Sequence, residues 1–196
     1  ITNYHVIKDA SVISIKMANN SVFSASVTSY DEENDIAVLK PNNIVKNTKW
    51  FELDSYKNNA IGSSIVVIGY PLSSVLGADV RVTQGIISSN VGIQSDKSRF
   101  QISASIQPGN SGGPIINKNN LVVWIASSRL SDSYLLKIMD TVPQNINFGV
   151  KSDKVLNILK KNKVKNTRTR ITSLEDAIKA TVLVNASSKD FNGMEI

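Results

Sequence analysis

Residues 107–114 of this chain read QPGNSGGP and place Ser111 at the apex of a tight turn between glycines. Glycine tolerates a positive φ and lets another backbone segment approach closely. Such a turn can direct consecutive backbone N–H groups at one point, as an oxyanion site requires. The stretch therefore predicts a nucleophilic role for Ser111.

Two earlier residues extend this pattern. His5, the only histidine, lies within ITNYHVI (residues 1–7), and Asp35 lies within NDIAVL (residues 34–39). A serine hydroxyl is a weak nucleophile unless an adjacent base accepts its proton, and the base needs an orienting partner. Neutral imidazole suits the base, and a carboxylate on the other ring N–H would fix its tautomer. The order His, Asp, Ser predicts a serine-nucleophile hydrolase.

Each of these residues also has a purely structural interpretation. A lone histidine is more often structural than catalytic, and an aspartate before an apolar run is more often a turn or cap residue. The glycine-rich stretch could be a surface turn. The three features together favour catalysis by His5, Asp35 and Ser111. We predict an oxyanion hole at Gly109, Asn110 and Ser111, with the backbone N–H groups of Gly109 and Ser111 as donors.

Length and composition limit the number of domains and the presence of membrane-spanning or targeting segments. The chain has 196 residues, of which 41% are hydrophobic, enough for the core of one or two domains. It contains no run of about eighteen apolar residues, and no signal peptide is visible. Because the sequence opens inside a motif rather than at an initiator methionine, we expect it to be a fragment of a longer protein.

Cysteine and charge narrow the classes of site. The sequence has no cysteine and one histidine, so disulfides and thiolate sites are excluded, and we expect no metal and no cofactor. The net charge is +6, and the surplus is concentrated in residues 151–170. A solvated helix end and linker explain this cluster, and a nucleic-acid or anionic-lipid patch is the alternative. No aromatic residue interleaves the cationic residues of the cluster, which argues against nucleic acid. Membrane association is left open.

Hydrophobic patterning predicts many short strands. Alternation over Val12–Met17 and Ser21–Tyr30, with a turn at Asn19-Asn20, predicts an antiparallel hairpin. Ile36–Leu39 reads as a buried strand and residues 40–47 as a loop. The further predicted strands are 64–69, 80–88, 100–106, 114–116, 121–126 and 146–150. This pattern is typical of an all-β barrel or sandwich fold.

The C-terminal part of the chain predicts helices and one more strand. A helix begins after Ser152 as N-cap and extends to about Lys163. Residues 167–172 read as a linker, and a capping box pairs Thr172 with Glu175 or Ser173 with Asp176. A short helix to about Ala180 would follow, and residues 181–184 would form a strand.

The quoted motifs resemble those of trypsin-like serine proteases, and within them the HtrA type. The resemblance covers about residues 1–160, and Asn110 before the nucleophile is typical of HtrA proteins. The matching segments are residues 2–7, 31–39, 68–71, 82–88, 105–114 and 146–150.

This resemblance implies an all-β fold with two perpendicular antiparallel β-barrels, the trypsin-like double barrel, and a C-terminal helix. Residues 1–60 would form the N-terminal barrel without its first strands and would carry His5 and Asp35. Residues 61–164 would form the second barrel and the terminal helix and would carry Ser111. Residues 165–196 would be a linker and tail, too short for the PDZ domain of HtrA proteins. Residues 181–184 are a candidate to fill the gap in the first barrel, whose edges would otherwise be open.

The resemblance also implies a specificity pocket, for which the candidates are Ile106, Ile125, Ala126 and Ser127. None of these is acidic, so a preference for small or medium apolar side chains is expected over lysine or arginine. The extended segment 126–128 would pair with the substrate backbone. Trp124 stands where HtrA proteins usually have glycine, and it would either crowd the cleft or pack behind it.

The function implied is that of a serine endopeptidase acting on unfolded or damaged polypeptides. HtrA relatives commonly act in the cell envelope as trimers, so a homo-oligomer in the periplasm, envelope or secreted space is expected. The alternative is a catalytically silent binding scaffold with a collapsed oxyanion turn or a blocked cleft. Esterase chemistry is a third interpretation, although nothing in the sequence resembles an α/β-hydrolase elbow.

Overall fold

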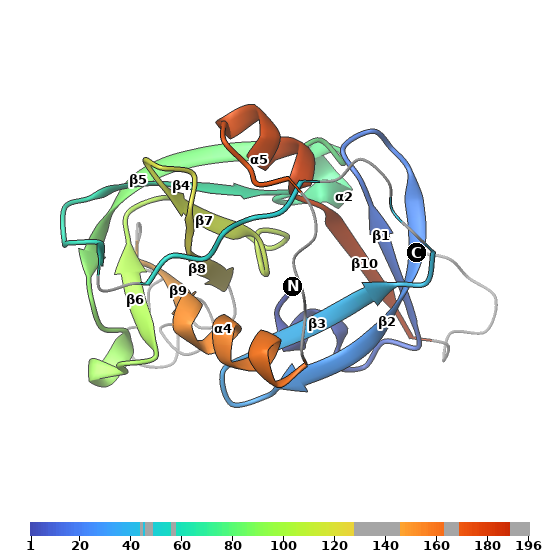
Figure 1. The fold of residues 1–196 in the computed structure, drawn as a ribbon, viewed down its shortest axis with the longest axis horizontal. Coiled ribbons are helices and arrows are strands. Elements are labelled where there is room, and N and C mark those ends of the chain that lie inside the picture. Colours follow the sequence, from blue (N-terminus) through green and yellow to red (C-terminus); the bar gives the residue numbers. More distant parts are fainter. Residues whose placement is uncertain (44, 46–48, 56–57, 128–145, 163–168, 189–196) are drawn as a thin grey trace.

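A computed structural model describes residues 1–43, 45, 49–55, 58–127, 146–162 and 169–188. Strands form two units, which lie side by side in Figure 1. The strands are β1 Val12–Lys16, β2 Val22–Asp31, β3 Ile36–Pro41, β4 Ser64–Gly69, β5 Arg81–Ser89, β6 Arg99–Ile102, β7 Pro114–Asn117, β8 Val122–Ser127, β9 Asn147–Lys151 and β10 Leu183–Ser187. The helices are α1 Tyr4–Ile7, α2 Ser73–Leu76, η2 Ile93–Ser95, α4 Ser152–Lys161 and α5 Leu174–Ala180.

The second unit is a closed antiparallel barrel with the strand order β4-β5-β6-β9-β8-β7. Its interior holds a buried cluster in which the rings of Phe100 and Trp124 stack with centroids 3.7 Å apart. Gly149 faces this pair, and a Cβ at that position would overlap the Phe100 ring. Trp124 therefore packs behind the cleft, inside the barrel, which decides between the two expectations for this residue.

Truncating Trp124 should be among the most destabilising single changes in the barrel. Trp124→Ala removes a side chain that is 1% exposed and leaves a cavity against Phe100. We expect a loss of about 3–5 kcal/mol in the free energy of unfolding, measured by denaturant titration. Val82→Ala on β5, where the side chain is 41% exposed, is the control and should change stability by less than about 0.5 kcal/mol. Equal effects of the two changes would contradict the packing.

The first unit is a sheet in the order β10-β1-β2-β3, open over the described residues. The predicted hairpin is confirmed, with β1 antiparallel to β2, and Ile13 and Ile15 of β1 are buried. The tail does supply a strand, but at Leu183–Ser187 rather than at the predicted residues 181–184; β10 pairs with the free edge of β1 and places Val184 opposite Ile15. Within the described part of the tail, β10 therefore extends the sheet of the first unit.

Helix α4 packs between the two units, against β2 and β3 on one side and β8 and β9 on the other. The predicted helix is confirmed, but its predicted N-cap is wrong. Lys151 occupies the cap position, and Ser152 lies inside the helix, where its hydroxyl donates to the carbonyl of Asp54 at 2.5 Å. Ser152 is the first helical residue, whereas the extended backbone that an N-cap requires is found at Lys151. None of the described helices is long and apolar enough to span a bilayer.

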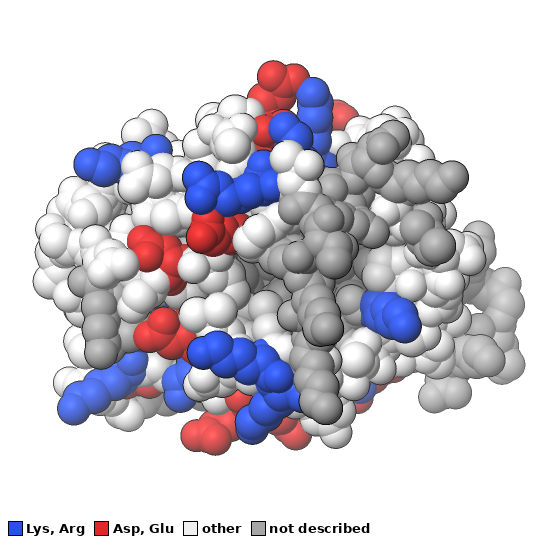
Figure 2. Space-filling view, viewed as in Figure 1, with Lys and Arg blue, Asp and Glu red and all other residues white. Residues whose placement is uncertain are grey.

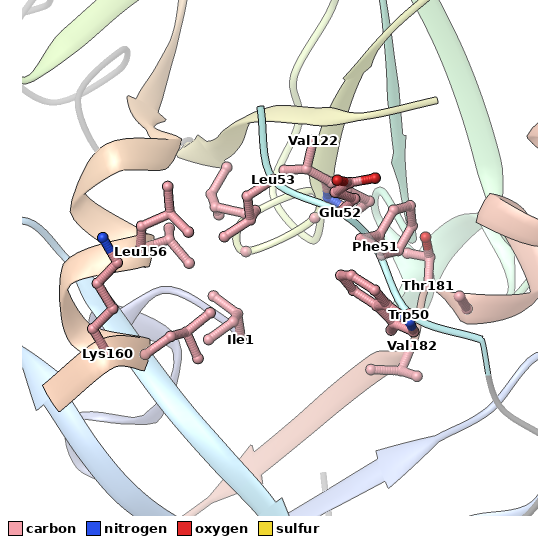
Figure 3. A pocket seen from close by; sticks show the side chains of 17 residues that line it. Ile1, Trp50, Phe51, Glu52, Leu53, Val122, Leu156, Lys160, Thr181 and Val182 are labelled. Carbon is pink, nitrogen blue, oxygen red and sulfur yellow. The ribbon is translucent and has the colours of Figure 1, made fainter. Parts of the chain in front are cut away.

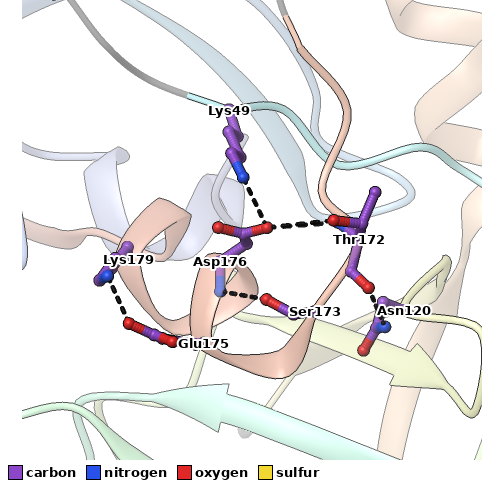
Figure 4. Close-up of polar contacts among 7 residues, drawn as sticks. All are labelled: Lys49, Asn120, Thr172, Ser173, Glu175, Asp176 and Lys179. Carbon is purple, nitrogen blue, oxygen red and sulfur yellow. Dashed lines mark hydrogen bonds and ion pairs between the residues drawn. The ribbon is translucent and has the colours of Figure 1, made fainter.

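Helix α5 begins as the capping motif predicts. The Ser173 side chain accepts a hydrogen bond from the Asp176 N–H at 3.1 Å. Lys49 donates to the Asp176 carboxylate at 2.7 Å, and Asn120 donates to the Thr172 carbonyl at 3.2 Å (Figure 4). These contacts tie α5 to the connection after β3 and to the turn between β7 and β8.

Acid should loosen α5 before the rest of the fold. The hydrogen bond from Lys49 lowers the pKa of Asp176 below its usual value. A carboxyl whose folded pKa is depressed stabilises the fold above its unfolded pKa, and this contribution is lost as the pH falls through the folded pKa. Below about pH 4 we expect hydrogen-exchange protection in α5 to fall relative to α4. Asp176→Asn should remove this pH dependence, and a parallel response of both helices would contradict it.

The basic cluster predicted near the C-terminus is only partly described, because residues 163–168 lie outside the described ranges. Within them, Arg170 pairs with Glu52 at 2.7 Å. Figure 2 shows lysine and arginine interspersed with acidic residues on this face rather than merged into one basic surface. This distribution fits a solvated, mixed surface better than a nucleic-acid footprint.

Candidate active site

His5 lies on α1, a single-turn helix that the sequence analysis did not predict. Thr2, two residues before this helix, pairs with Ala37 near the start of β3. Thr2 donates to the Ala37 carbonyl at 3.0 Å, and Ala37 donates back at 2.8 Å. This bridge places the histidine segment beside the strand that directly follows Asp35.

Asp35 is buried and holds His5 through both carboxylate oxygens. Its Oδ2 lies 2.7 Å from His5 Nδ1, and its Oδ1 accepts the His5 backbone N–H at 2.9 Å. Asp35 adopts a positive φ of 56°, and Asn3 donates to its carbonyl at 2.7 Å. With Nδ1 engaged by the carboxylate, Nε2 is the ring atom left to accept a proton.

Ser127 gives Asp35 a further donor. Its hydroxyl, buried at the end of β8, donates to Asp35 Oδ2 at 3.3 Å. A buried carboxylate needs such donors to offset its desolvation. From the sequence, Ser127 is predicted only as a substrate-binding residue. No local signal could have revealed this contact, because the two residues are 92 positions apart.

The serine turn approaches the histidine segment through Gly112. This residue has a φ of 83°, and a Cβ there would overlap Thr2 and crowd the backbone N of Asn3. Its N–H donates to the Ala126 carbonyl at 2.9 Å, which fixes the turn on β8. His5 and Ser111 consequently line one groove of about 620 Å³.

The oxyanion turn is shaped by Gly109, which lines the same groove and has a φ of 97°. A Cβ there would overlap the carbonyl oxygen of Tyr70, so the close approach requires glycine. The predicted Asn110 is buried, and its N–H donates to the Gln107 carbonyl at 2.9 Å. The Asn110 backbone N–H therefore serves the turn itself, and the backbone N–H groups of Gly109 and Ser111 stay the predicted donors to an oxyanion.

Tyr70 stands behind this turn. Burial raises the pKa of its phenol, with a smaller contribution from the charge of Asp79, so the hydroxyl stays protonated. It donates to the Thr181 carbonyl at 3.1 Å. This contact links the oxyanion turn to the C-terminal tail.

The predicted specificity residues do not form one group. Ile106 and Ala126 lie together in the cluster inside the barrel, whereas Ile125 packs in the separate cluster between the two units. The Ala126 N–H donates to the Gly113 carbonyl, and the Ala126 carbonyl accepts the Gly112 N–H. Both backbone groups of Ala126 are therefore engaged, and a substrate backbone could pair with β8 no earlier than Ser127. Residue 128 of the proposed pairing segment lies outside the described residues.

Ile125 lines a second cavity, of about 480 Å³, shown in Figure 3. Its walls are largely apolar and come from the segment around Phe51, from Val122 on β8 and from Leu156 on α4. Gly112, Gly113, Thr181 and Val182 line both this cavity and the groove at Ser111. The cavity and the groove are therefore adjacent.

The arrangement supports acyl transfer. An oriented imidazole, a buried carboxylate and a glycine-flanked serine are the groups that such a reaction requires. Across the described ranges, no three His, Cys, Asp or Glu side chains gather closely enough to hold a metal ion.

Comparisons with known proteins agree with this geometry. The sequence profile of the family described as "Trypsin-like peptidase domain" matches residues 1–124. An uncharacterized protein, y4bJ, from Sinorhizobium fredii is 34% identical over 77% of this chain, and a "Serine protease HtrA-like" from Staphylococcus aureus is 32% identical over 84%. The chain spans only 23% and 22% of the lengths of these relatives. The crystal structure of a serine endoprotease from Yersinia pestis superposes with a TM-score of 0.64 at 31% identity, covering 82% of this chain and 52% of that one.

Proposed function

Because the chain belongs to the trypsin-like peptidase family, we propose that it is a serine endopeptidase that cleaves unfolded or damaged polypeptides through an acyl-enzyme on Ser111. The observation that carries this proposal is the two-point contact between Asp35 and His5. That contact orients the imidazole in the groove that Ser111 also lines. A structural histidine would not need such placement beside a serine turn.

The proposed reaction has two stages. In the first, Ser111 Oγ attacks the substrate carbonyl carbon while His5 Nε2 takes the hydroxyl proton. The tetrahedral oxyanion accepts hydrogen bonds from the backbone N–H groups of Gly109 and Ser111. His5 then gives the proton to the departing amine, and the ester remains on Ser111.

In the second stage, water attacks the ester and His5 again serves as base and then as acid. Asp35 stays ionised throughout and stabilises the imidazolium. The Ser127 hydroxyl and the His5 backbone N–H help to keep the carboxylate in that state.

An extended polypeptide is the substrate that fits this arrangement. Ser111 lies in a groove between two packed units. An unfolded chain can bring a scissile bond into this groove, because its extended backbone is free to pair with an exposed strand edge. The similarity to HtrA-like proteases supports the same substrate class. The placement of Trp124 inside the barrel removes one reason to favour the silent scaffold.

Incubation with casein, which is largely unfolded, tests the proposal. We expect peptides to accumulate over time, and pretreatment with a fluorophosphonate to stop their release. A tightly folded protein of similar size should remain intact under the same conditions. Binding of casein without any cleavage would contradict the proposal and favour the scaffold.

A further inference from the structure

We propose that residues Thr181–Asn185 form the wall of the catalytic groove on the side where the leaving group departs, and that Val182 makes this side select an apolar substrate residue directly after the scissile bond. This inference rests on the proposed endopeptidase function. Residues 181–185 all line the groove that contains His5, Gly109 and Ser111.

The position of the imidazole identifies the leaving-group side. In acyl transfer the departing amine receives its proton from the histidine, so it leaves past that side chain. The groove is lined by His5, Val6, Lys8 and Asp9 from α1 and the residues that follow it. Ile106, Ala126 and Ser127, the predicted specificity residues, do not line it. The tail therefore borders the part of the groove beyond the scissile bond.

Two valines of the tail line this groove from different surroundings. Val184, on β10, also packs against the cluster of Ile7 and Ile13 beside α1. Val182 lies one residue before β10. Val182 is partly buried and lines both the groove and the cavity in Figure 3, where its side chain is seen below Trp50.

The tail is held in this position at two points. The Thr181 carbonyl accepts the hydroxyl of Tyr70, whose own carbonyl lies against Gly109 of the oxyanion turn. Thr181 also ends α5, with its N–H donating to the Ala177 carbonyl at 3.0 Å. The Tyr70 contact therefore fixes the wall relative to the oxyanion turn, and Asp176 ties the helix that precedes the wall to Lys49 (Figure 4).

The chemistry of the wall predicts its preference. Val182, Leu183 and Val184 are the apolar side chains that the tail contributes to the groove, and Val6 of α1 lines it as well. An aliphatic wall favours an aliphatic partner, and a hydrophobic contact of this size discriminates by about tenfold. We expect valine after the scissile bond to be preferred to lysine.

Two kinds of substrate with the same acyl-side sequence test the inference. Internally quenched peptides differ only in valine or lysine directly after the scissile bond. A peptide coumarin amide has no residue there and serves as the reference for each rate. In wild type, we expect the kcat/KM ratio of valine to lysine peptide to be about 10. In Val182→Glu it should fall about tenfold or more, since a carboxylate attracts lysine and disfavours valine.

Matched variants separate the outcomes. Leu174→Glu introduces the same charge at an exposed position at the start of α5, outside the groove, and should leave the ratio unchanged. If Val182→Glu does not fold, Val182→Ala carries the test, with a ratio lowered by about threefold. Cleavage of the coumarin amide with an unaltered ratio in the foldable Val182 variant would overturn the inference and leave the peptidase intact. Failure of wild type to cleave any substrate would overturn the proposed function, and the inference with it.

Discussion

Replacing Ser111 with alanine should reduce peptide hydrolysis by about 10⁶-fold, because loss of the nucleophile in a serine-protease triad removes the covalent route altogether. The hydroxyl lies in the groove shared with His5 and Gly109. The turn itself depends on glycines and backbone hydrogen bonds rather than on this hydroxyl. Casein should therefore still bind to Ser111→Ala while its cleavage stops.

The control for this change is Ser88→Ala. Ser88 is exposed on β5, so its truncation should leave kcat/KM within about twofold of wild type. The thermal unfolding midpoints of both variants are measured in parallel. Undiminished cleavage by Ser111→Ala would show that another residue is the nucleophile, and the proposed reaction would be abandoned.

Asp35→Asn should lower kcat by about 10⁴-fold with a smaller effect on KM. The amide is nearly isosteric with the carboxylate, but it cannot accept hydrogen bonds through both terminal atoms. Asp35 Oδ2 receives the His5 ring and the Ser127 hydroxyl, and Oδ1 receives the His5 backbone N–H. In the asparagine, the NH₂ group replaces either Oδ1 or Oδ2 and faces a donor that it cannot accept from. When it faces the His5 ring, it favours the wrong tautomer of His5.

Glu33→Gln provides the matched control in the same turn. It makes the same change of carboxylate to amide at an exposed position, and it should leave kcat unchanged within about twofold. Steady-state kinetics on a peptide coumarin amide separate kcat from KM. An equal, small effect of both variants would mean that Asp35 acts as an ordinary turn residue.

The strands of both units could largely be predicted from sequence. Alternation of apolar and polar residues predicted β1 and its hairpin with β2, because one face of these strands is buried. The continuous apolar run predicted β3, because both of its faces are buried. The capping box located the start of α5 for a similar local reason, since the Ser173 side chain and the Asp176 N–H are three residues apart.

Contacts between distant segments could not be predicted. Helix α1 has a single turn and no periodicity, so nothing in the sequence marks it. Ser152 has the chemistry of an N-cap, but α4 begins at Ser152 itself with Lys151 as its cap, and the hydroxyl donates to a carbonyl 98 residues away. Ile125 and Ala126 are consecutive on β8 and so face opposite sides of the strand. Which of the two sides faces the barrel interior is decided by how β8 packs in the folded chain.

The candidate site likewise has residues that the sequence predicts and contacts that it does not. The motifs named His5, Asp35 and Ser111, and the structure brings His5 to Asp35 at 2.7 Å. The donor role of Ser127 and the tail beside the groove depend on chain segments that only the folded structure brings together.

Mass spectrometry after reaction with a fluorophosphonate identifies the nucleophile. We expect one covalent adduct, located on Ser111 by peptide mapping, and its loss in His5→Ala because the hydroxyl then has no base. A wild-type protein that stays unlabelled while a control serine protease reacts, or that carries the adduct on a different residue, would contradict the proposed reaction.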